Sequence, residues 1–150
     1  DGLDAATVLV THDRHEATAL AGTTALLVDG GIRQVGATAC VLDEPVDVDC
    51  ARLVGYTNLL PPAATGRAEL LAARPENCRA VAGEPAGLGL RGTVRRVVPL
   101  GGATRVDVDT PAGTLACLAP GADDLTPGRA AAVCVAEEHV RRLRHPLTAW

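Results

Sequence analysis

The sequence has 150 residues and a formal net charge of −4, enough chain for one ordinary domain or two small ones. It contains no Lys, no Ser, no Phe and no Met, and only one Tyr and one Trp. The absence of Ser excludes serine-hydrolase chemistry. The lack of aromatic stacking platforms and of a strong positive charge argues against a nucleic-acid binder. No apolar run is long enough to span a bilayer and no signal-peptide pattern opens the sequence, so we expect a soluble chain.

Charge and composition divide the sequence in two. Residues 1–60 hold 3 Arg and 9 acidic residues, whereas residues 61–150 hold 11 Arg and 9 acidic residues. The stretch 55–66 between them is rich in Pro, Gly and Ala. Such a change predicts two units of different character, with their boundary inside 55–66.

The first unit has the pattern of an α/β segment. Residues 7–10 (TVLV) are a short apolar run typical of a strand buried on both faces of a parallel sheet. Left without neighbouring strands, this run would expose open edges, so we expect it to pair with another copy or to pack against the hairpin or the barrel. The other predicted elements are a helix over 14–21, hairpin strands over 24–28 and 32–35, and short helices over 38–42 and 47–54.

The second unit has the pattern of a small antiparallel barrel, with short strands and turn signals about every ten residues. Its clearest strand is 105–109, where strict alternation predicts that Val106 and Val108 point inward. The predicted strands are 70–74, 77–81, 92–98, 104–109, 114–118, 130–136 and 139–143.

The residues that could carry chemistry follow the first predicted strand. A His at the carboxyl end of a buried parallel strand lies where α/β folds bind ligands, and the ring N–H of His12 could donate to a phosphate oxygen there. The alternative is that His12 only caps the following helix. His12, Asp13, His15 and Glu16 do not follow a known metal-binding order, so we expect no metal site.

Two other features predict little chemistry. The five cysteines form no C-x-x-C motif, and an odd number cannot all pair, so we expect free thiols in a reducing cytosol. The basic residues within 141–145 fit a solvated strand end better than an anion-binding or RNA-binding site.

Several short motifs appear in an order that resembles one family. Residues 10–17 (VTHDRHEA) are similar to the switch segment, or H-loop, of ABC transporter ATP-binding subunits. Residues 27–36 (LVDGGIRQVG) resemble the D-G-x-I-x-Q-x-G hairpin of the importer subunits, and Glu44-Pro45 with 54–60 (VGYTNLL) resembles the exit from their nucleotide-binding domain. Further short motifs resemble the TOBE regulatory domain of these subunits: Arg74-Pro75-Glu76, 91–94, 100–105 and Pro127-Gly128.

The resemblance implies a fold and a site. Residues 1–58 would be an α/β remnant of a P-loop ATPase domain, 59–66 a linker, and 67–145 an all-β, OB-like TOBE barrel. His12 would be the switch histidine that contacts the γ-phosphate of ATP. The family's phosphate-binding loop lies upstream of Asp1, so we expect the chain to be inactive alone and to bind no cofactor, whereas the complete subunit would use ATP and Mg.

The resemblance also implies a function. The complete subunit would be cytoplasmic and peripheral on the inner face of the cell membrane. It would form a homodimer, dock on permease subunits, act indirectly with a solute-binding protein, and couple ATP hydrolysis to uptake of a small solute. The motif order is most similar to importers of polyamines, iron(III) or phosphonates, with sugar, sulfate and molybdate importers left open. The alternative is a stand-alone TOBE-type module that binds a small oxyanion such as molybdate.

Overall fold

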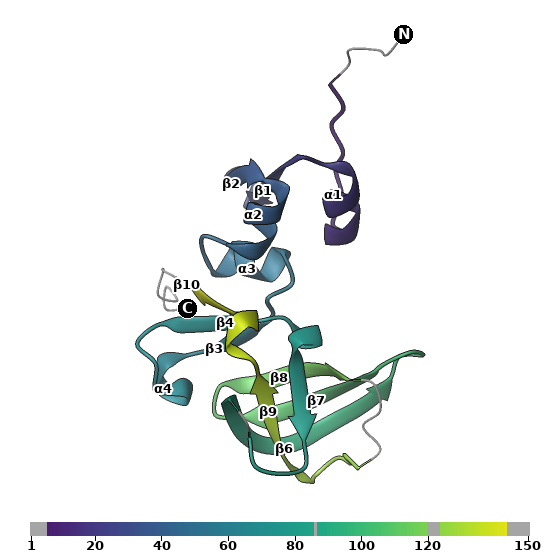
Figure 1. Ribbon diagram of the computed structural model, residues 1–150, viewed down its shortest axis with the longest axis vertical. Helices are drawn as coiled ribbons and strands as arrows, with labels where there is room; N and C mark the ends of the chain where they lie inside the picture. Colours follow the sequence, from purple (N-terminus) through teal and green to yellow (C-terminus); the bar gives the residue numbers. More distant parts are fainter. Residues whose placement is uncertain (1–5, 86, 120–123, 144–150) are drawn as a thin grey trace.

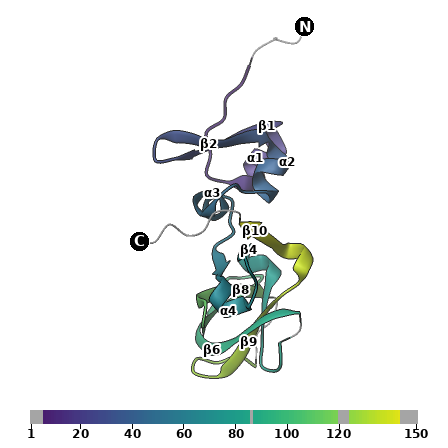
Figure 2. The same ribbon diagram turned by 90° about the vertical axis from the view of Figure 1, so that its left-hand side faces the viewer.

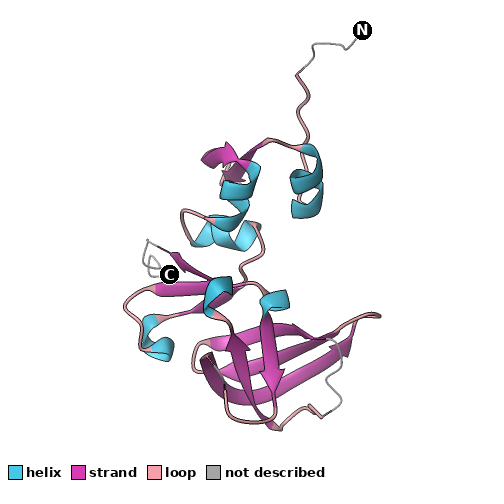
Figure 3. Cartoon of the chain, in the orientation of Figure 1, coloured by secondary structure: helices cyan, strands magenta, loops and turns pink. Residues whose placement is uncertain are grey.

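The computed structural model describes residues 6–85, 87–119 and 124–143. Short helices and a hairpin occupy one end of the molecule, and strands occupy the other (Figure 1, Figure 3). None of the described helices is both long and apolar enough to cross a membrane. The amino-terminal elements are α1 (Arg14–Leu20), β1 (Thr23–Val28), β2 (Gly31–Ala37), α2 (Thr38–Asp43) and α3 (Val48–Leu53).

The predicted hairpin is confirmed. β1 and β2 pair antiparallel, with Thr23 opposite Ala37, and the tight turn between them places Asp29 and Gly30 at positive φ, 50° and 77°. Gly tolerates this conformation without steric cost, and Asp is one of the few other residues that adopt it. Asp47 caps α3 by accepting a hydrogen bond from the Cys50 backbone N–H at 2.8 Å.

The predicted buried strand over residues 7–10 is wrong. Residues 6–11 form neither helix nor strand, and the side chains of Val8 and Val10 are 88% and 92% exposed. Figure 1 shows this segment leading away from the hairpin, and Figure 2 shows it at the opposite end of the molecule from the strands of the second unit, so the expected packing against them is also absent. An apolar β-branched run favours extended backbone, but it becomes a strand only when neighbouring backbone supplies hydrogen bonds. The α/β arrangement expected for 1–58 is therefore not confirmed.

A three-stranded sheet lies beneath α2 and α3. Its order is β10 (Val140–Leu143), β4 (Leu70–Ala73), β3 (Asn58–Leu60), all antiparallel. The stretch 59–66, expected as a linker, holds the end of β3 and helix α4 (Pro62–Thr65). Leu42, Val54 and Tyr56 share one apolar core with this sheet. The proposed limits 1–58 and 67–145 stay a prediction, and 144–145 lie outside the described residues.

The remaining strands form one curled, antiparallel sheet with an OB-like form (Figure 1). Its order is β5-β9-β6-β7-β8, an open half-barrel among the described residues rather than the closed barrel predicted. Val106 and Val108 are fully buried in its core, as the alternation predicts. The strands are β5 (Cys78–Val81), β6 (Leu88–Pro99), β7 (Thr104–Thr110), β8 (Gly113–Ala119) and β9 (Ala130–Val135), with 3-10 turns η1 (Pro75–Asn77) and η2 (Glu137–His139).

Gly92 lies where β6 and β7 approach too closely for a side chain. A Cβ there would overlap the carbonyl oxygen of Asp109 and would stand 2.9 Å from Cγ1 of Val108. We expect Gly92→Ala to lower the free energy of unfolding by about 2 kcal/mol, because the two strands must separate. Gly102→Ala is the matched control, since a Cβ there meets nothing within 4 Å. Urea denaturation of both variants checks this, and equal midpoints would contradict it.

Candidate functional site

A cleft of about 460 Å³ separates the amino-terminal segment from the curled sheet. Residues 12–15 line one side, at the loop before α1 and its first turn. Leu53, Gly55 and Thr57, which follow α3, line a second part, and residues from the sheet side complete it: Pro75, Glu76 and Arg105. The structure therefore places His12, the predicted site residue, in a cleft built from segments distant in sequence.

Side-chain hydrogen bonds organise the loop that carries His12. The hydroxyl of Thr11 donates to Glu16 Oε2 at 2.5 Å and accepts from the Asp13 backbone N–H at 3.0 Å. Asp13 caps α1, because its carboxylate accepts from the His15 backbone N–H at 2.7 Å. That hydrogen bond lowers the pKa of Asp13. The helix cap is thus Asp13, so the alternative that His12 is only a cap is wrong.

The two imidazoles on this side of the cleft form no side-chain hydrogen bond or ion pair among the described residues. His12 and His15 are exposed, and the Asp13 carboxylate is their electrostatic neighbour. The carboxylates beside them are engaged, Asp13 as the cap and Glu76 in an ion pair with Arg14. Burial raises the pKa of Glu76, but the Arg14 hydrogen bond, its own backbone N–H and the charges of Arg14 and Arg74 together bring that pKa below its usual value, so the carboxyl stays ionised at neutral pH. An imidazole held here can donate to an anion such as a phosphate oxygen.

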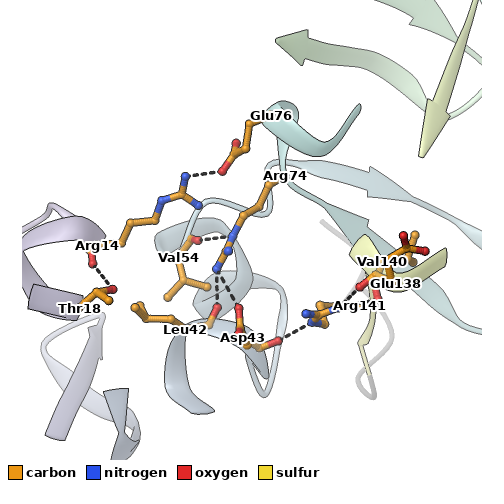
Figure 4. Close-up of polar contacts among 10 residues, drawn as sticks. All are labelled: Arg14, Thr18, Leu42, Asp43, Val54, Arg74, Glu76, Glu138, Val140 and Arg141. Atoms are coloured by element: carbon orange, nitrogen blue, oxygen red, sulfur yellow. Dashed lines mark hydrogen bonds and ion pairs between the residues drawn. The ribbon is translucent and has the colours of Figure 1, made fainter. Parts of the chain in front are cut away.

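The ion pair between Arg14 and Glu76 connects α1, which follows the His12 loop, to η1, which follows β4. Figure 4 shows Glu76, in η1, reaching the guanidinium of Arg14 in the first turn of α1. Gly55, at φ 94°, packs against this guanidinium, since a Cβ there would stand 3.1 Å from Arg14 Nη1. Sequence patterns did not reveal this contact, because 62 residues separate Arg14 from Glu76.

In the part of the chain that the structure describes, no side-chain cluster suits a metal ion, and three of the thiols are buried. No group of three or more His, Cys, Asp or Glu side chains is placed to hold a metal ion within the described ranges. All five cysteines are free. Burial raises the pKa of Cys50 to about 12 and that of Cys78 to about 11, and it also raises the pKa of Cys117. These thiols stay protonated at neutral pH and cannot serve as nucleophiles there.

The basic carboxyl-terminal strand is more than a solvated end. The Arg141 guanidinium donates from Nε to the Asp43 carbonyl oxygen at 2.8 Å, and Arg142 lies 3.6 Å from a carboxylate oxygen of Glu69. Arg144 and His145, named with them in the sequence, lie outside the described residues. The prediction of a solvated strand end is therefore wrong for Arg141.

Comparison with known proteins gives a family and several relatives. The TOBE domain family matches residues 71–143. The sulfate/thiosulfate import ATP-binding protein CysA of Burkholderia mallei is 30% identical over 132 residues, covering 75% of this chain and 38% of that protein. The spermidine/putrescine import ATP-binding protein PotA of Ruegeria pomeroyi is 41% identical over 54 residues, covering 36% of this chain and 15% of that protein.

The chain therefore spans less than two fifths of the length of either relative. Among solved structures, the cytoplasmic molybdate-binding protein ModG is similar with a TM-score of 0.45 and 14% sequence identity. That likeness covers 54% of this chain and 67% of the ModG chain, and it is too slight to bear on function.

Proposed function

We propose that this chain, whose residues 71–143 match the TOBE domain family, is the C-terminal part of an ABC importer ATP-binding subunit, the class of both curated relatives. The observation that carries the proposal is the extent of the CysA match. That match covers 75% of the chain, more than residues 71–143 alone provide. The match therefore reaches upstream of residue 71, into the part of the chain that precedes the TOBE match.

Exposed apolar side chains on the amino-terminal segment support this proposal. Leu27, Ile32 and Val35 of the hairpin are 62%, 68% and 63% exposed, and Val8 and Val10 before α1 are more exposed still. Exposed apolar side chains gathered on one segment are often covered by a protein partner. In the proposed subunit, the rest of the ATP-binding domain covers these side chains.

In the proposed mechanism, the chain contributes one group to the reacting phosphate. His12 donates a hydrogen bond from its imidazole to a γ-phosphate oxygen, where negative charge develops during transfer. Thr11 and Asp13 hold the loop through the contacts described above, so the imidazole is placed before nucleotide arrives. The sequence has no Lys and no phosphate-cradling Gly-rich loop. The other contacts to ATP and Mg thus belong to the complete subunit.

The proposal also includes the partners and the cellular location of the complete subunit. The complete subunit would work as a homodimer on permease subunits at the inner face of the cell membrane, with a solute-binding protein acting indirectly. It would drive uptake of a small solute such as a polyamine, iron(III) or a phosphonate. The named relatives import spermidine/putrescine and sulfate/thiosulfate, which fits a small-solute importer of this kind.

A chimeric subunit tests the proposal. Residues 6–143 would replace the matching C-terminal region of the Burkholderia mallei CysA protein, and ATP hydrolysis would be compared with that of the truncated CysA protein. We expect the chimera to hydrolyse ATP and both the truncated protein and this chain alone to release no phosphate above blank, because neither holds a complete set of phosphate contacts. An inactive, folded chimera would contradict the proposal.

The stand-alone alternative makes a different prediction for the chain by itself. Calorimetric titration with molybdate, tungstate and sulfate would show tight binding of one of them if the chain is an oxyanion-binding module. Tight binding together with an inactive chimera would replace the proposed function by the alternative.

A further inference from the structure

Arg74 lies where the TOBE domain meets the amino-terminal helices (Figure 4). It follows β4 directly, and its guanidinium donates from Nη2 to the Leu42 carbonyl at 2.7 Å and from Nε to the Val54 carbonyl at 3.2 Å. Leu42 lies in the last turn of α2, and Val54 is the C-cap of α3. Carbonyls at helix ends lack partners within the helix, so one side chain satisfies the ends of two helices.

The surroundings of Arg74 fix its position. Its guanidinium carbon lies 4.3 Å from the centroid of the buried Tyr56 ring, and Nη2 lies 3.6 Å from Asp43 Oδ1. The Arg74 side chain is only 16% exposed. A guanidinium that is stacked on an aromatic ring and bonded to two carbonyls has little freedom to bind a solvent anion. These contacts indicate a structural role.

Arg141 reaches the same turn from the other end of the TOBE domain. It lies on β10, which pairs with β4 so that Arg141 stands opposite Ala72, two residues before Arg74. Its guanidinium donates to the carbonyl of Asp43 at 2.8 Å, the residue that follows Leu42. Arg74, directly after β4, and Arg141, on β10, thus both bind carbonyl oxygens at the end of α2.

A third contact continues from this turn to the hairpin. The side chain of Gln34, in β2, donates from Nε2 to the Glu44 carbonyl at 2.9 Å and accepts from the Val46 backbone N–H at 3.1 Å. The segment 42–46 is therefore held by arginines on the TOBE side and by a glutamine on the hairpin side. Through segment 42–46, these hydrogen bonds link the three-stranded sheet to the hairpin.

We propose that Arg74 and Arg141, which we name the arginine clamp, couple the TOBE domain to the amino-terminal segment, so that a displacement of β4 and β10 moves α2 and, through Gln34, the hairpin. Coupling through the arginine clamp is a property beyond the proposed function, and it does not require bound nucleotide. It assigns a role to the arginine of the Arg74-Pro75-Glu76 motif, while Glu76 adds the separate tie to α1. The interaction energy between residues on the two sides of segment 42–46 measures this coupling.

Amide hydrogen exchange on the whole chain tests the clamp. Because each guanidinium makes charge-assisted hydrogen bonds to carbonyls at the helix ends, we expect Arg74→Gln and Arg141→Gln each to raise exchange across α2 and α3 roughly tenfold or more. Amides of the curled sheet should keep their protection and so report that the variants are folded. Arg79→Gln is the matched control, because Arg79 is exposed on β5 and has no polar partner among the described residues.

Two further variants separate coupling from simple loss of stability. Arg74→Lys keeps the charge but cannot present the planar fork to both carbonyls, so its effect should approach that of Arg74→Gln. In a double-mutant cycle of Arg74→Gln with Gln34→Ala, exchange of the hairpin amides should change non-additively. Additive effects, or unchanged exchange in α2 and α3 after loss of either arginine, would overturn the proposal. Neither result depends on ATP, so failure of the clamp is distinguishable from failure of the proposed function.

Discussion

Replacing Asn58 with alanine is expected to lower the free energy of unfolding by about 3 kcal/mol, because two buried backbone groups lose their partners. The Asn58 side chain is buried, and its amide pairs with the backbone of Ala116 in β8 as a neighbouring strand would. Nδ2 donates to the Ala116 carbonyl at 2.7 Å, and Oδ1 accepts from the Ala116 N–H at 2.9 Å. Nδ2 also lies 3.1 Å from Sγ of Cys78 in β5, so the residue bridges the two edges of the curled sheet.

The measurement is urea denaturation at neutral pH, with Asn77→Ala as the control. The Asn77 side chain has no polar partner in the described part of the chain, so that variant should stay within about 0.5 kcal/mol of the parent. Asn58→Asp should be as damaging as Asn58→Ala, because a carboxylate cannot donate to the Ala116 carbonyl. Equal midpoints for the variants at Asn58 and Asn77 would contradict this role.

The strands of the second unit could be predicted because their signals are local. All seven predicted strands are present, and the alternation over 105–109 placed Val106 and Val108 in the core correctly. The predicted bounds differ most from the structure for β6, which begins at Leu88 rather than at Gly92. Gly89 and Gly92 interrupt its side-chain pattern, and Gly92 is required by the close approach of β7. Local propensity cannot report such a long-range requirement.

The site was predicted only in part. The sequence identified His12, but it offered both a ligand contact and a helix cap, although Asp13 followed by Glu16 three residues later is itself a cap signal. Asn58 and Arg74 were not predicted as structural residues. Their partners lie 58 residues away at Ala116 and 32 residues away at Leu42. The prediction of a strand over 7–10 was wrong for the opposite reason. Its local sequence signal is clear, but the described residues supply no neighbouring strand to pair with it.

Substituting His12 with alanine in the CysA chimera is expected to lower ATP turnover by roughly a hundredfold or more, while ATP affinity changes only a few-fold. The reason is that a donor aimed at developing charge stabilises the transition state more than the bound nucleotide. The variant should fold like the parent chimera, because the His12 imidazole is exposed. The hydrogen bonds that hold its loop are made by Thr11, Asp13 and Glu16.

His15→Ala is the matched control for this experiment. His15 is also an exposed imidazole on the cleft, three residues further along, and like His12 its side chain has only the Asp13 carboxylate as an electrostatic neighbour among the described residues. We expect its removal to leave turnover within about twofold of the chimera, since loss of a group that does not touch the reacting atoms costs little. Turnover measured at saturating ATP, with nucleotide affinity measured separately by calorimetry, distinguishes the two histidines. If His12→Ala retains full turnover, or if both variants lose it equally, His12 is not the residue that contacts the γ-phosphate.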